Sequence, residues 1–339
     1  MKLRVGVVGL GSAWETRHRP ALRALSDRYE VRAVCSEVAL QAEQAAGEFQ
    51  AQPIEGFRAL AQREDVDAVL MLASEWYGSL PILAASDAGK AIYCASALEP
   101  DPEMIHRIKQ RIEQSGVAFM SEFACRHAPA TLRLKELIAT QLGKPRLLFC
   151  HRRELAEDGN QPRRRCMAQQ TSLQQLVELV DWCRYVVGRE PIMVGGQMHR
   201  ASPDADRYDY QMLSLDFSLP ESAKNGPVAQ ISCGRYVPSC WPEAVTFRPP
   251  AALQVVCEHG IAFIDLPSTL IWFDQAGRHL ESLESERPVG EQLLSQFYRA
   301  VVSLVRNTSS LEDMYRSLRI VLDAQRSHRE NRRISLIEL

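Results

Sequence analysis

The sequence predicts an α/β protein with an N-terminal doubly wound parallel sheet and a C-terminal α+β domain built on a largely antiparallel, open sheet. Over the first 120 residues, short β-branched runs alternate with helical patterns, whereas strand patterns follow one another between residues 192 and 275. The length of 339 residues also exceeds what one ordinary core organises. We expect domains at 1–122 and 123–339, with a C-terminal helix at 311–326 able to pack back on the first domain.

The first domain is expected to alternate strands and helices. The expected strands are 3–8, 31–35, 68–72, 91–94 and 117–120. The expected helices are 13–26, 39–49, 77–88 and 102–114. Gly89 and Gly116 follow the last two helices as stop signals. This alternation favours parallel strands joined by crossover helices.

The second domain follows a different pattern. The expected elements are a helix at 128–140, a strand at 146–153, a loop rich in Arg and Gln, a helix at 173–187, the strand series up to 275, and helices at 291–306 and 311–326. Gly188 closes the apolar helix 173–187. Strands in a run, flanked by helices, indicate an α+β domain.

Composition excludes several classes of function. A formal net charge of −2 argues against binding to nucleic acid or to an anionic membrane surface, and no apolar stretch approaches bilayer length. The nine cysteines are scattered and none form a C-x-x-C pair, which argues against a disulfide framework or a metal site. We therefore expect a cytoplasmic protein that binds no metal.

A glycine turn follows the first strand. The run VGVVGLGSAW places Gly9 and Gly11 between a strand and a helix, with Trp14 at the position where this motif normally has Gly or Ala. The first glycine permits the tight turn and the second lets backbone amides approach a pyrophosphate, as in a Rossmann dinucleotide site. The neighbouring contacts to the cofactor are expected from Leu10, Ser12 and Ala13. The alternative is a purely structural turn, and the indole of Trp14 either points away or occupies space beside the phosphates.

Residues at the ends of the next strands complete the expected cofactor site. Ser36 and Glu37 follow the second strand without an adjacent base, which favours the free 2′-hydroxyl of NAD over NADP, although they can instead cap the next helix. Further contacts are expected from Ala73, Ser74 and Ala95.

Several segments resemble the Gfo/Idh/MocA oxidoreductase family in order and spacing. They are GLGSAWETRHRPALRAL, VDAVLMLAS, AASDAGK, FACRHAP (123–129) and the C-terminal LEDMYRSLRIVLDAQRSHRENRRISL. The resemblance covers nearly the whole chain. It implies hydride transfer between NAD(P) and a small-molecule substrate, namely a sugar, inositol or similar carbinol. It also implies a homodimer or homotetramer formed through the C-terminal sheet.

The family's catalytic positions are substituted in this chain. The Glu-Lys-Pro motif falls on Ala95-Ser96-Ala97, so that Ser96 stands where the family has Lys. The Asp and His of the family's helix fall on Gln174 and Glu178, while Asp181 keeps its carboxylate. The resemblance therefore implies altered acid–base groups at these positions.

The helix 173–187 carries a narrow polar stripe. Gln174, Glu178, Asp181 and Tyr185 share one face at helical spacing, and apolar residues fill most of the remaining circumference. The stripe faces either water or a ligand pocket. If it faces a pocket, Glu178 can act as general acid or base and Tyr185 can contact substrate, whereas Ser96 is too weak an acid to replace Lys.

A group of arginines is the second candidate for substrate binding. Arg126, Arg152 and Arg153, with the loop 163–165, can converge on an anionic ligand, or alternate strand arginines can face solvent. We expect Arg126 to contact substrate. Three functions remain open: an NAD(P)-dependent oxidoreductase, a non-catalytic cofactor- or ligand-binding regulatory protein, and a structural subunit that uses its open sheet for contact.

Overall fold

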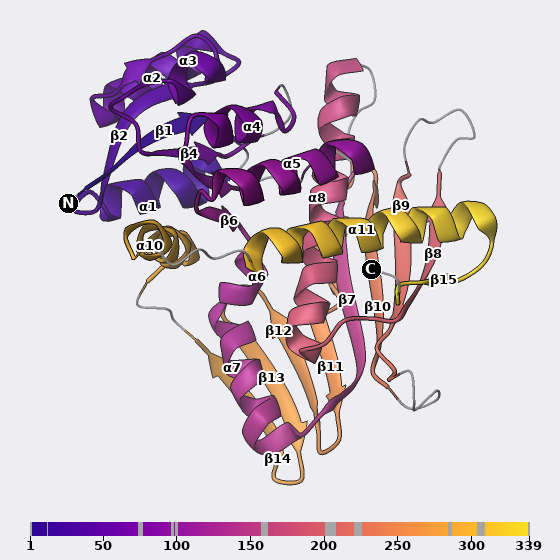
Figure 1. Ribbon diagram of the computed structural model, residues 1–339. Helices are drawn as coiled ribbons and strands as arrows, with labels where there is room; N and C mark the ends of the chain where they lie inside the picture. The colour runs from indigo at the N-terminus through magenta and orange to yellow at the C-terminus, as the bar shows by residue number, and fades with distance from the viewer. Residues whose placement is uncertain are drawn as a thin grey trace. The chain divides into compact units, whose positions relative to one another are not determined.

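The computed structural model of the chain divides into two compact units (Figure 1). It describes residues 2–11, 13–73, 77–95, 98, 101–156, 162–200, 208–219, 226–283, 287–303 and 309–337. Unit 1 comprises 1–124 with 286–315, and unit 2 comprises 125–285 with 316–339. The sequence-based division at residues 122 and 123 does not assign 286–315 to the first domain.

Unit 1 is built on a parallel six-stranded sheet of order β3-β2-β1-β4-β5-β6. Its strands are β1 (Leu3–Val8), β2 (Tyr29–Cys35), β3 (Gln52–Pro53), β4 (Ala68–Met71), β5 (Ala91–Cys94) and β6 (Phe119–Ser121). The chain reverses its direction of winding between β1 and β4, which makes the carboxyl ends of these strands the switch point of the sheet. The expected doubly wound parallel sheet is confirmed.

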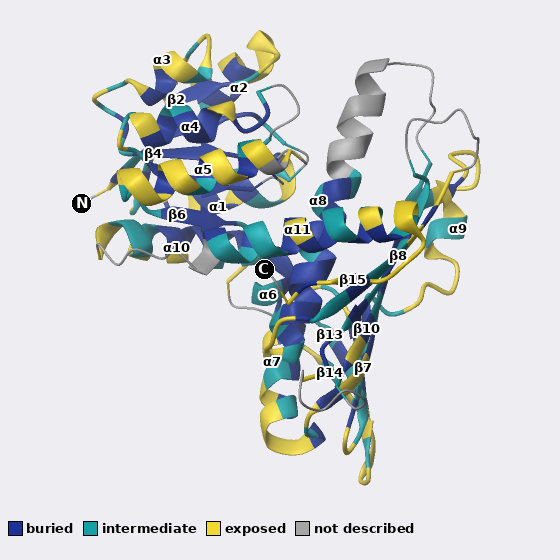
Figure 2. Ribbon diagram, turned by 45° about the vertical axis from the view of Figure 1, so that its right-hand side comes forward, coloured by how far each residue is buried: buried dark blue, intermediate teal, exposed yellow. Residues whose placement is uncertain are grey.

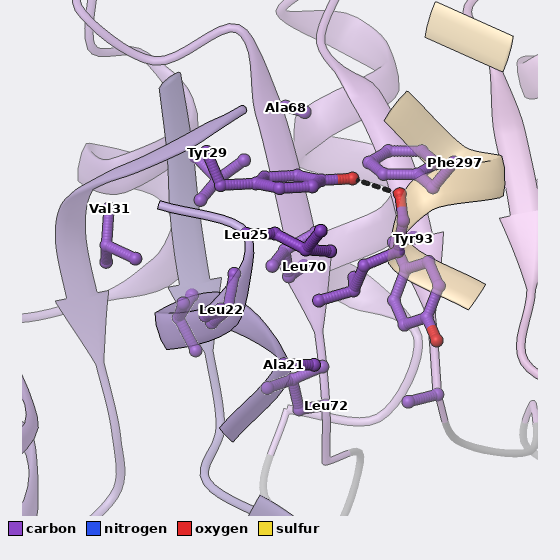
Figure 3. Close-up of a cluster of buried hydrophobic side chains, with 14 of the residues drawn as sticks. Ala21, Leu22, Leu25, Tyr29, Val31, Ala68, Leu70, Leu72, Tyr93 and Phe297 are labelled. Carbon is purple, nitrogen blue, oxygen red and sulfur yellow. Dashed lines mark hydrogen bonds between the residues drawn. The ribbon is translucent and has the colours of Figure 1, made fainter. Parts of the chain in front are cut away.

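Helices cover both faces of this sheet. They are α1 (Arg19–Ala24), α2 (Ala39–Phe49), α3 (Phe57–Ala61), α4 (Leu80–Asp87), α5 (Pro102–Ser115) and α10 (Val289–Val302). On the face of α1, α2 and α10, one apolar cluster joins the sheet to all three helices. Figure 3 shows Phe297 of α10 beside Tyr93 of β5, with ring centroids 5.5 Å apart, and the hydroxyl of Tyr29, which donates to the carbonyl oxygen of Leu294 at 2.6 Å. These contacts explain why a segment distant in sequence belongs to unit 1.

The first helix differs from the expected single helix at 13–26. It opens with a π-helical turn, η1 (Trp14–His18), and continues as α1 only to Ala24. In the π turn the amide of His18 donates to the carbonyl oxygen of Ala13 at 3.2 Å. The wider turn accommodates one more residue, and the side chains of both Trp14 and His18 are buried. The short β3 and α3 were also absent from the expectations, because both fall below the length at which periodicity is informative.

Unit 2 contains a nine-stranded sheet of order β14-β13-β12-β11-β7-β10-β9-β8-β15. Its strands are β7 (Pro145–Leu155), β8 (Met193–His199), β9 (Tyr210–Asp216), β10 (Val228–Val237), β11 (Leu253–Cys257), β12 (Ile261–Asp265), β13 (Thr269–Asp274), β14 (Gly277–Ser282) and β15 (Ile334–Ser335). Neighbouring strands are antiparallel, apart from the parallel pair of β7 and β10. The expected largely antiparallel sheet is confirmed.

Helices of unit 2 lie against one face of this sheet. They include α6 (Ala124–His127), α7 (Pro129–Leu137) with the π turn η2 (Ile138–Leu142), α8 (Pro162–Val187) and α11 (Ser309–Glu330), whose residues from 316 on belong here. The short α9 (Glu243–Thr246) lies at the other face, where the carbonyl oxygen of Val245 accepts from Arg153 of β7. The expectation of a loop before residue 173 is wrong, because α8 already begins at Pro162 and includes 163–165. Proline is favoured in the first turn of a helix, and the Arg, Gln, Met and Ala that follow it are good helix formers.

The other face of the unit 2 sheet is largely without a helical cover. Along β9, β11 and β12, buried residues alternate with half-buried or exposed ones (Figure 2). Apolar side chains on this open face include Leu147, Phe149, Phe263 and Phe273. No helix among the described residues combines the length and apolar character needed to cross a bilayer.

Candidate functional site

The turn after β1 has no room for side chains at its two glycines. Gly9 has a φ of +76°, and a Cβ there would lie 2.7 Å from the Cβ of Ala73. A Cβ at Gly11 would lie 2.4 Å from the carbonyl oxygen of Leu72. The amide of Gly9 also donates to the carbonyl oxygen of Cys35, at 2.8 Å. The turn is therefore packed against the ends of β2 and β4, at the edge where this type of sheet binds ligands.

Trp14 turns its indole into the core of unit 1. The side chain is only 6% exposed and meets the ring of Phe49 in α2 edge-on, with centroids 6.0 Å apart. Its amide donates to the carbonyl oxygen of Gly11 at 2.9 Å, which starts the π turn. The indole points toward α2, and Trp14 also lines the pocket that adjoins the glycine turn.

The residues expected to contact the cofactor at the ends of β2, β4 and β5 differ in how deeply they are buried. Ser36 is half-buried and Glu37 is exposed, and the residue that precedes α2 as its N-cap is Val38. Ala73 is half-buried after β4, and Ala95 is buried after β5. Ser12, Ser74, Ser96 and Ala97 lie outside the described residues.

A pocket of about 440 Å³ adjoins the glycine turn. Leu10 and Gly11 line it from the turn, and Gln41, Gln44 and Glu48 line it from α2. The guanidinium of Arg19 lines it from α1 and pairs with Glu48, Nε to Oε2 at 2.7 Å. The pocket thus carries charges of both signs next to the apolar side chains of Leu10, Trp14 and Ala45.

A buried network that the sequence analysis missed joins the first helix to the ends of β5 and β6. The Oε2 of Glu122, directly after β6, lies 2.6 Å from Nε2 of His18 and accepts a hydrogen bond of 2.6 Å from the hydroxyl of Tyr93. Its other oxygen pairs with Arg17. Burial alone would raise the pKa of Glu122, but the hydrogen bond from His18 and the charges of His18 and Arg17 lower it to about 2. The sequence contained one indication of this network, because Glu122 is a single carboxylate directly after an apolar strand.

Between residues 172 and 187, the part of α8 whose side chains are described, most residues of the polar stripe are less buried than the apolar residues around them. Gln174, Glu178 and Tyr185 are half-buried, whereas Asp181 is 1% exposed. The stripe predicted from helical spacing therefore exists, but its members differ in burial.

Both oxygens of Glu178 already have partners. Its Oε1 accepts from the thiol of Cys125 at 3.3 Å, and its Oε2 lies 3.1 Å from Nη1 of Arg152 in β7. Burial, followed by the nearby charge of Glu178, raises the pKa of Cys125 well above its usual value. Cys125 is therefore a neutral donor to this carboxylate.

Asp181 binds two arginines. Nε of Arg126 donates to its Oδ2 at 2.6 Å, and the second oxygen pairs with Nη2 of the same guanidinium. Arg184, 3% exposed, approaches Asp181 at 3.5 Å and continues to Glu190 at 2.6 Å and to the hydroxyl of Ser317 at 2.8 Å. The guanidinium of Arg126 also lies over the ring of Tyr185, 5.3 Å from its centroid.

The arginines do not converge on one point. Arg126 is directed at Asp181 and Arg152 at Glu178. Arg153 is next to Arg152 in a strand, so it points to the open face, where it donates to the carbonyl oxygen of Val245 at 2.7 Å. The side chains of 163–165 lie outside the described residues.

Comparison with known proteins agrees with the fold and with the glycine turn. Residues 3–123 match the model of the oxidoreductase family with an NAD-binding Rossmann fold. The chain is also similar to dTDP-3,4-didehydro-2,6-dideoxy-alpha-D-glucose 3-reductase from Actinomadura kijaniata, with 30% identity over 141 residues. That match spans 40% of this chain and 41% of the reductase.

Solved structures share the fold over almost the whole chain. One is the aldose-aldose oxidoreductase from Caulobacter crescentus, with a TM-score of 0.84, 17% identity, and coverage of 99% of this chain and 100% of that chain. Another is the myo-inositol 2-dehydrogenase from Lactobacillus plantarum, with a TM-score of 0.77, 17% identity, and 99% coverage of both chains. These structures confirm the fold, and the match of residues 3–123 to the family model confirms the expected resemblance to Gfo/Idh/MocA oxidoreductases.

Proposed function

We propose that this chain, whose residues 3–123 belong to the oxidoreductase family with an NAD-binding Rossmann fold, moves a hydride between NAD(P) and a sugar, inositol or related polyol. The similar proteins named above act, by their names, on a nucleotide-linked sugar, on aldoses and on myo-inositol. These names support a substrate class with several hydroxyl groups.

The glycine turn is the observation that carries this proposal. Gly9 and Gly11 have no space for a Cβ, and the indole of Trp14 packs toward α2. The residues present therefore fit a dinucleotide. We propose that backbone amides of Leu10, Gly11, Ser12 and Ala13 hold the pyrophosphate, while Gly9 and Trp14, whose amides bond within the protein, lie against it at the two ends of the turn. Ser36 and Glu37 would lie at the ribose, and Ala73, Ser74 and Ala95 along the strand ends. The bound nicotinamide would supply the hydride acceptor or donor.

The chain itself has to handle the proton. When a carbinol loses its hydride, the hydroxyl proton must pass to a base, and the reverse reaction needs an acid. Glu178 is the better candidate for this role, because its carboxylate is 23% exposed whereas that of Asp181 is nearly inaccessible. We propose that Gln174, Ser96 and Tyr185 provide hydrogen bonds to substrate, and that Asp181 holds Arg126 in a position to contact it.

Cofactor titration tests the first half of the proposal. We expect the purified protein to enhance the fluorescence of NADH or NADPH at saturable concentrations. Gly11→Ala should weaken that binding at least about tenfold, because its Cβ pushes the turn away from Leu72 and the amides with it. Gly47→Ala in α2 is the matched control, since a Cβ there meets nothing within 4 Å. The absence of binding at millimolar cofactor would refute the proposal.

One observation favours the alternative of a non-catalytic, ligand-binding regulatory protein. Glu178 already accepts from Cys125 and pairs with Arg152, so a substrate hydroxyl must displace one of these partners to reach it. A panel of polyols and aldoses followed at 340 nm separates the two functions. Cofactor binding with no turnover on any member of the panel would favour the regulatory protein.

We further propose that two or four copies assemble through the open face of the unit 2 sheet. Leu147 and Phe273, both more than 40% exposed, lie on this face, and such an apolar face is a typical contact surface. Light scattering during size-exclusion chromatography tests this, and a monomer at micromolar concentration would refute it. A cytoplasmic location is proposed as well, since the described cysteines are free thiols, all buried but Cys240.

A further inference from the structure

The pocket beside the glycine turn bears on which nicotinamide cofactor the chain accepts, an inference that rests on the proposed function. In a dinucleotide fold the adenosine ribose lies near the end of the second strand, beside the glycine turn. A 2′-substituent on that ribose would enter the space between the turn and the helix after the second strand. The pocket adjoins this space, since Leu10, Gly11 and Trp14 line it beside the turn, and Gln41 and Gln44 line it from α2.

Two carboxylates neutralise the arginine that lines this pocket. Nε of Arg19 lies 2.7 Å from Oε2 of Glu48, and Nη1 of Arg19 pairs with Glu15. The other oxygen of Glu48 pairs with Arg23. Glu48 therefore engages two guanidinium groups, and its side chain is only 17% exposed.

A 2′-phosphate is poorly compatible with this arrangement. At neutral pH it carries a charge of about −1.5 to −2 and needs guanidinium or ammonium donors directed at it. Arg19 can provide such donors only if it leaves its carboxylates. Glu15 would then lose this partner, Glu48 would keep only Arg23, and both carboxylates would lie beside the phosphate as like charges. A 2′-hydroxyl meets no such obstacle, because it is neutral and can donate to a carboxylate.

We propose that Glu48 is a specificity-determining residue: by holding Arg19 and Arg23, it excludes the 2′-phosphate from the pocket, so that the chain binds NAD(H) and discriminates against NADP(H). The residue that discriminates between the two cofactors therefore lies within α2, the helix that follows Ser36 and Glu37 at the end of β2.

Direct binding measurements test this assignment. The dissociation constants of NADH and NADPH would be measured by nicotinamide fluorescence for the wild type and for Glu48→Gln. We expect the wild type to favour NADH, and Glu48→Gln to bind NADPH about tenfold more tightly with little change for NADH. The gain should diminish as salt is raised, because it depends on exposed charges.

Three further variants make the result specific. Glu43→Gln makes the same change of charge on an exposed position of α2 that does not line the pocket, and should leave the cofactor ratio unchanged. Arg19→Gln in the Glu48→Gln background should remove the gain. Glu15→Gln, at a side chain that is 65% exposed, should shift the ratio in the same direction as Glu48→Gln but less.

Equal affinities of the wild type for both cofactors, or NADPH affinity unchanged in both Glu48→Gln and Glu15→Gln, would overturn the assignment while leaving the proposed function in place. Failure of the wild type to bind either cofactor would instead refute the proposed function, and the assignment with it.

Discussion

The glycine turn of unit 1 and the polar stripe of unit 2 are held in place by different physical means. At the turn, Gly9 and Gly11 are fixed by steric contact with Ala73 and Leu72, and no charged side chain is needed to shape the backbone. On α8, by contrast, Glu178 and Asp181 are fixed by ion pairs with arginines. A binding turn made of backbone amides tolerates substitutions of the surrounding side chains. The two members of an ion pair, by contrast, must be substituted together.

This difference bears on the pattern that the family resemblance implies for each unit. In unit 1 the two glycines of the turn are present, and Trp14 is accommodated by a π turn and by packing against Phe49. For the substrate side, the resemblance implies that Ser96, Gln174 and Glu178 stand where the family has Lys, Asp and His. Substitutions in the charge pairs of unit 2 and in the buried network of unit 1 measure how far each depends on electrostatics.

The largest effect is expected at Asp181. Asp181→Ala removes a carboxylate that is 1% exposed and that both Arg126 and Arg184 approach, and removing one partner of a buried pair typically costs about 3–5 kcal/mol. Urea denaturation of the variant and the wild type measures this loss. The matched control is Glu136→Ala at an exposed partner of Arg133, which should cost less than about 1 kcal/mol. Similar losses in both variants would show that burial does not govern the strength of these pairs.

A somewhat smaller effect is expected at Glu122 in unit 1. Its pKa is about 2 in the folded chain, against an ordinary value of 4.5, and such a difference corresponds to about 3 kcal/mol of stability. Because the folded pKa is the lower one, this stability is present above pH 4.5 and is lost as the pH falls from 4.5 toward 2. Glu122→Gln should lose it at neutral pH and should show a flatter decline in acid.

Chemical denaturation between pH 7 and pH 3 checks that behaviour. The curves of the wild type and Glu122→Gln should approach each other as the pH falls. Parallel curves over this range would mean that Glu122 does not titrate with the lowered pKa.

The sequence predicted the fold well because its signals are local. β1 and α2 have the expected bounds, since a β-branched run and an apolar helical period are each complete within about ten residues. The beginning of α8 was missed, because a charged segment can be a loop or a solvated helix and composition does not distinguish them. The π turn was missed as well, since it depends on where Trp14 and His18 find room in the core.

The candidate site was predictable only in part, for the same reason. The glycine turn was visible from two glycines after a strand, but the partners of the charged residues were not. Arg126 and Asp181 are 55 residues apart in sequence, and His18 and Glu122 are 104 apart. Such pairs depend on which strands become neighbours, and a single sequence does not carry that information.

The smallest effect on stability, and the sharpest distinction between the two proposed functions, is expected at Glu178. Glu178→Gln keeps the hydrogen bond from Cys125 but removes the charge opposite Arg152, and because both side chains are about one-quarter exposed the loss should stay near 1 kcal/mol or below. Turnover should nevertheless fall about 10²–10⁴-fold if the carboxylate handles the proton, since an amide cannot exchange one. Cofactor affinity, measured by fluorescence on the same samples, should remain unchanged, because the glycine turn lies in unit 1. Turnover that survives the substitution would remove Glu178 from the chemistry, and its carboxylate would then serve only to neutralise Arg152.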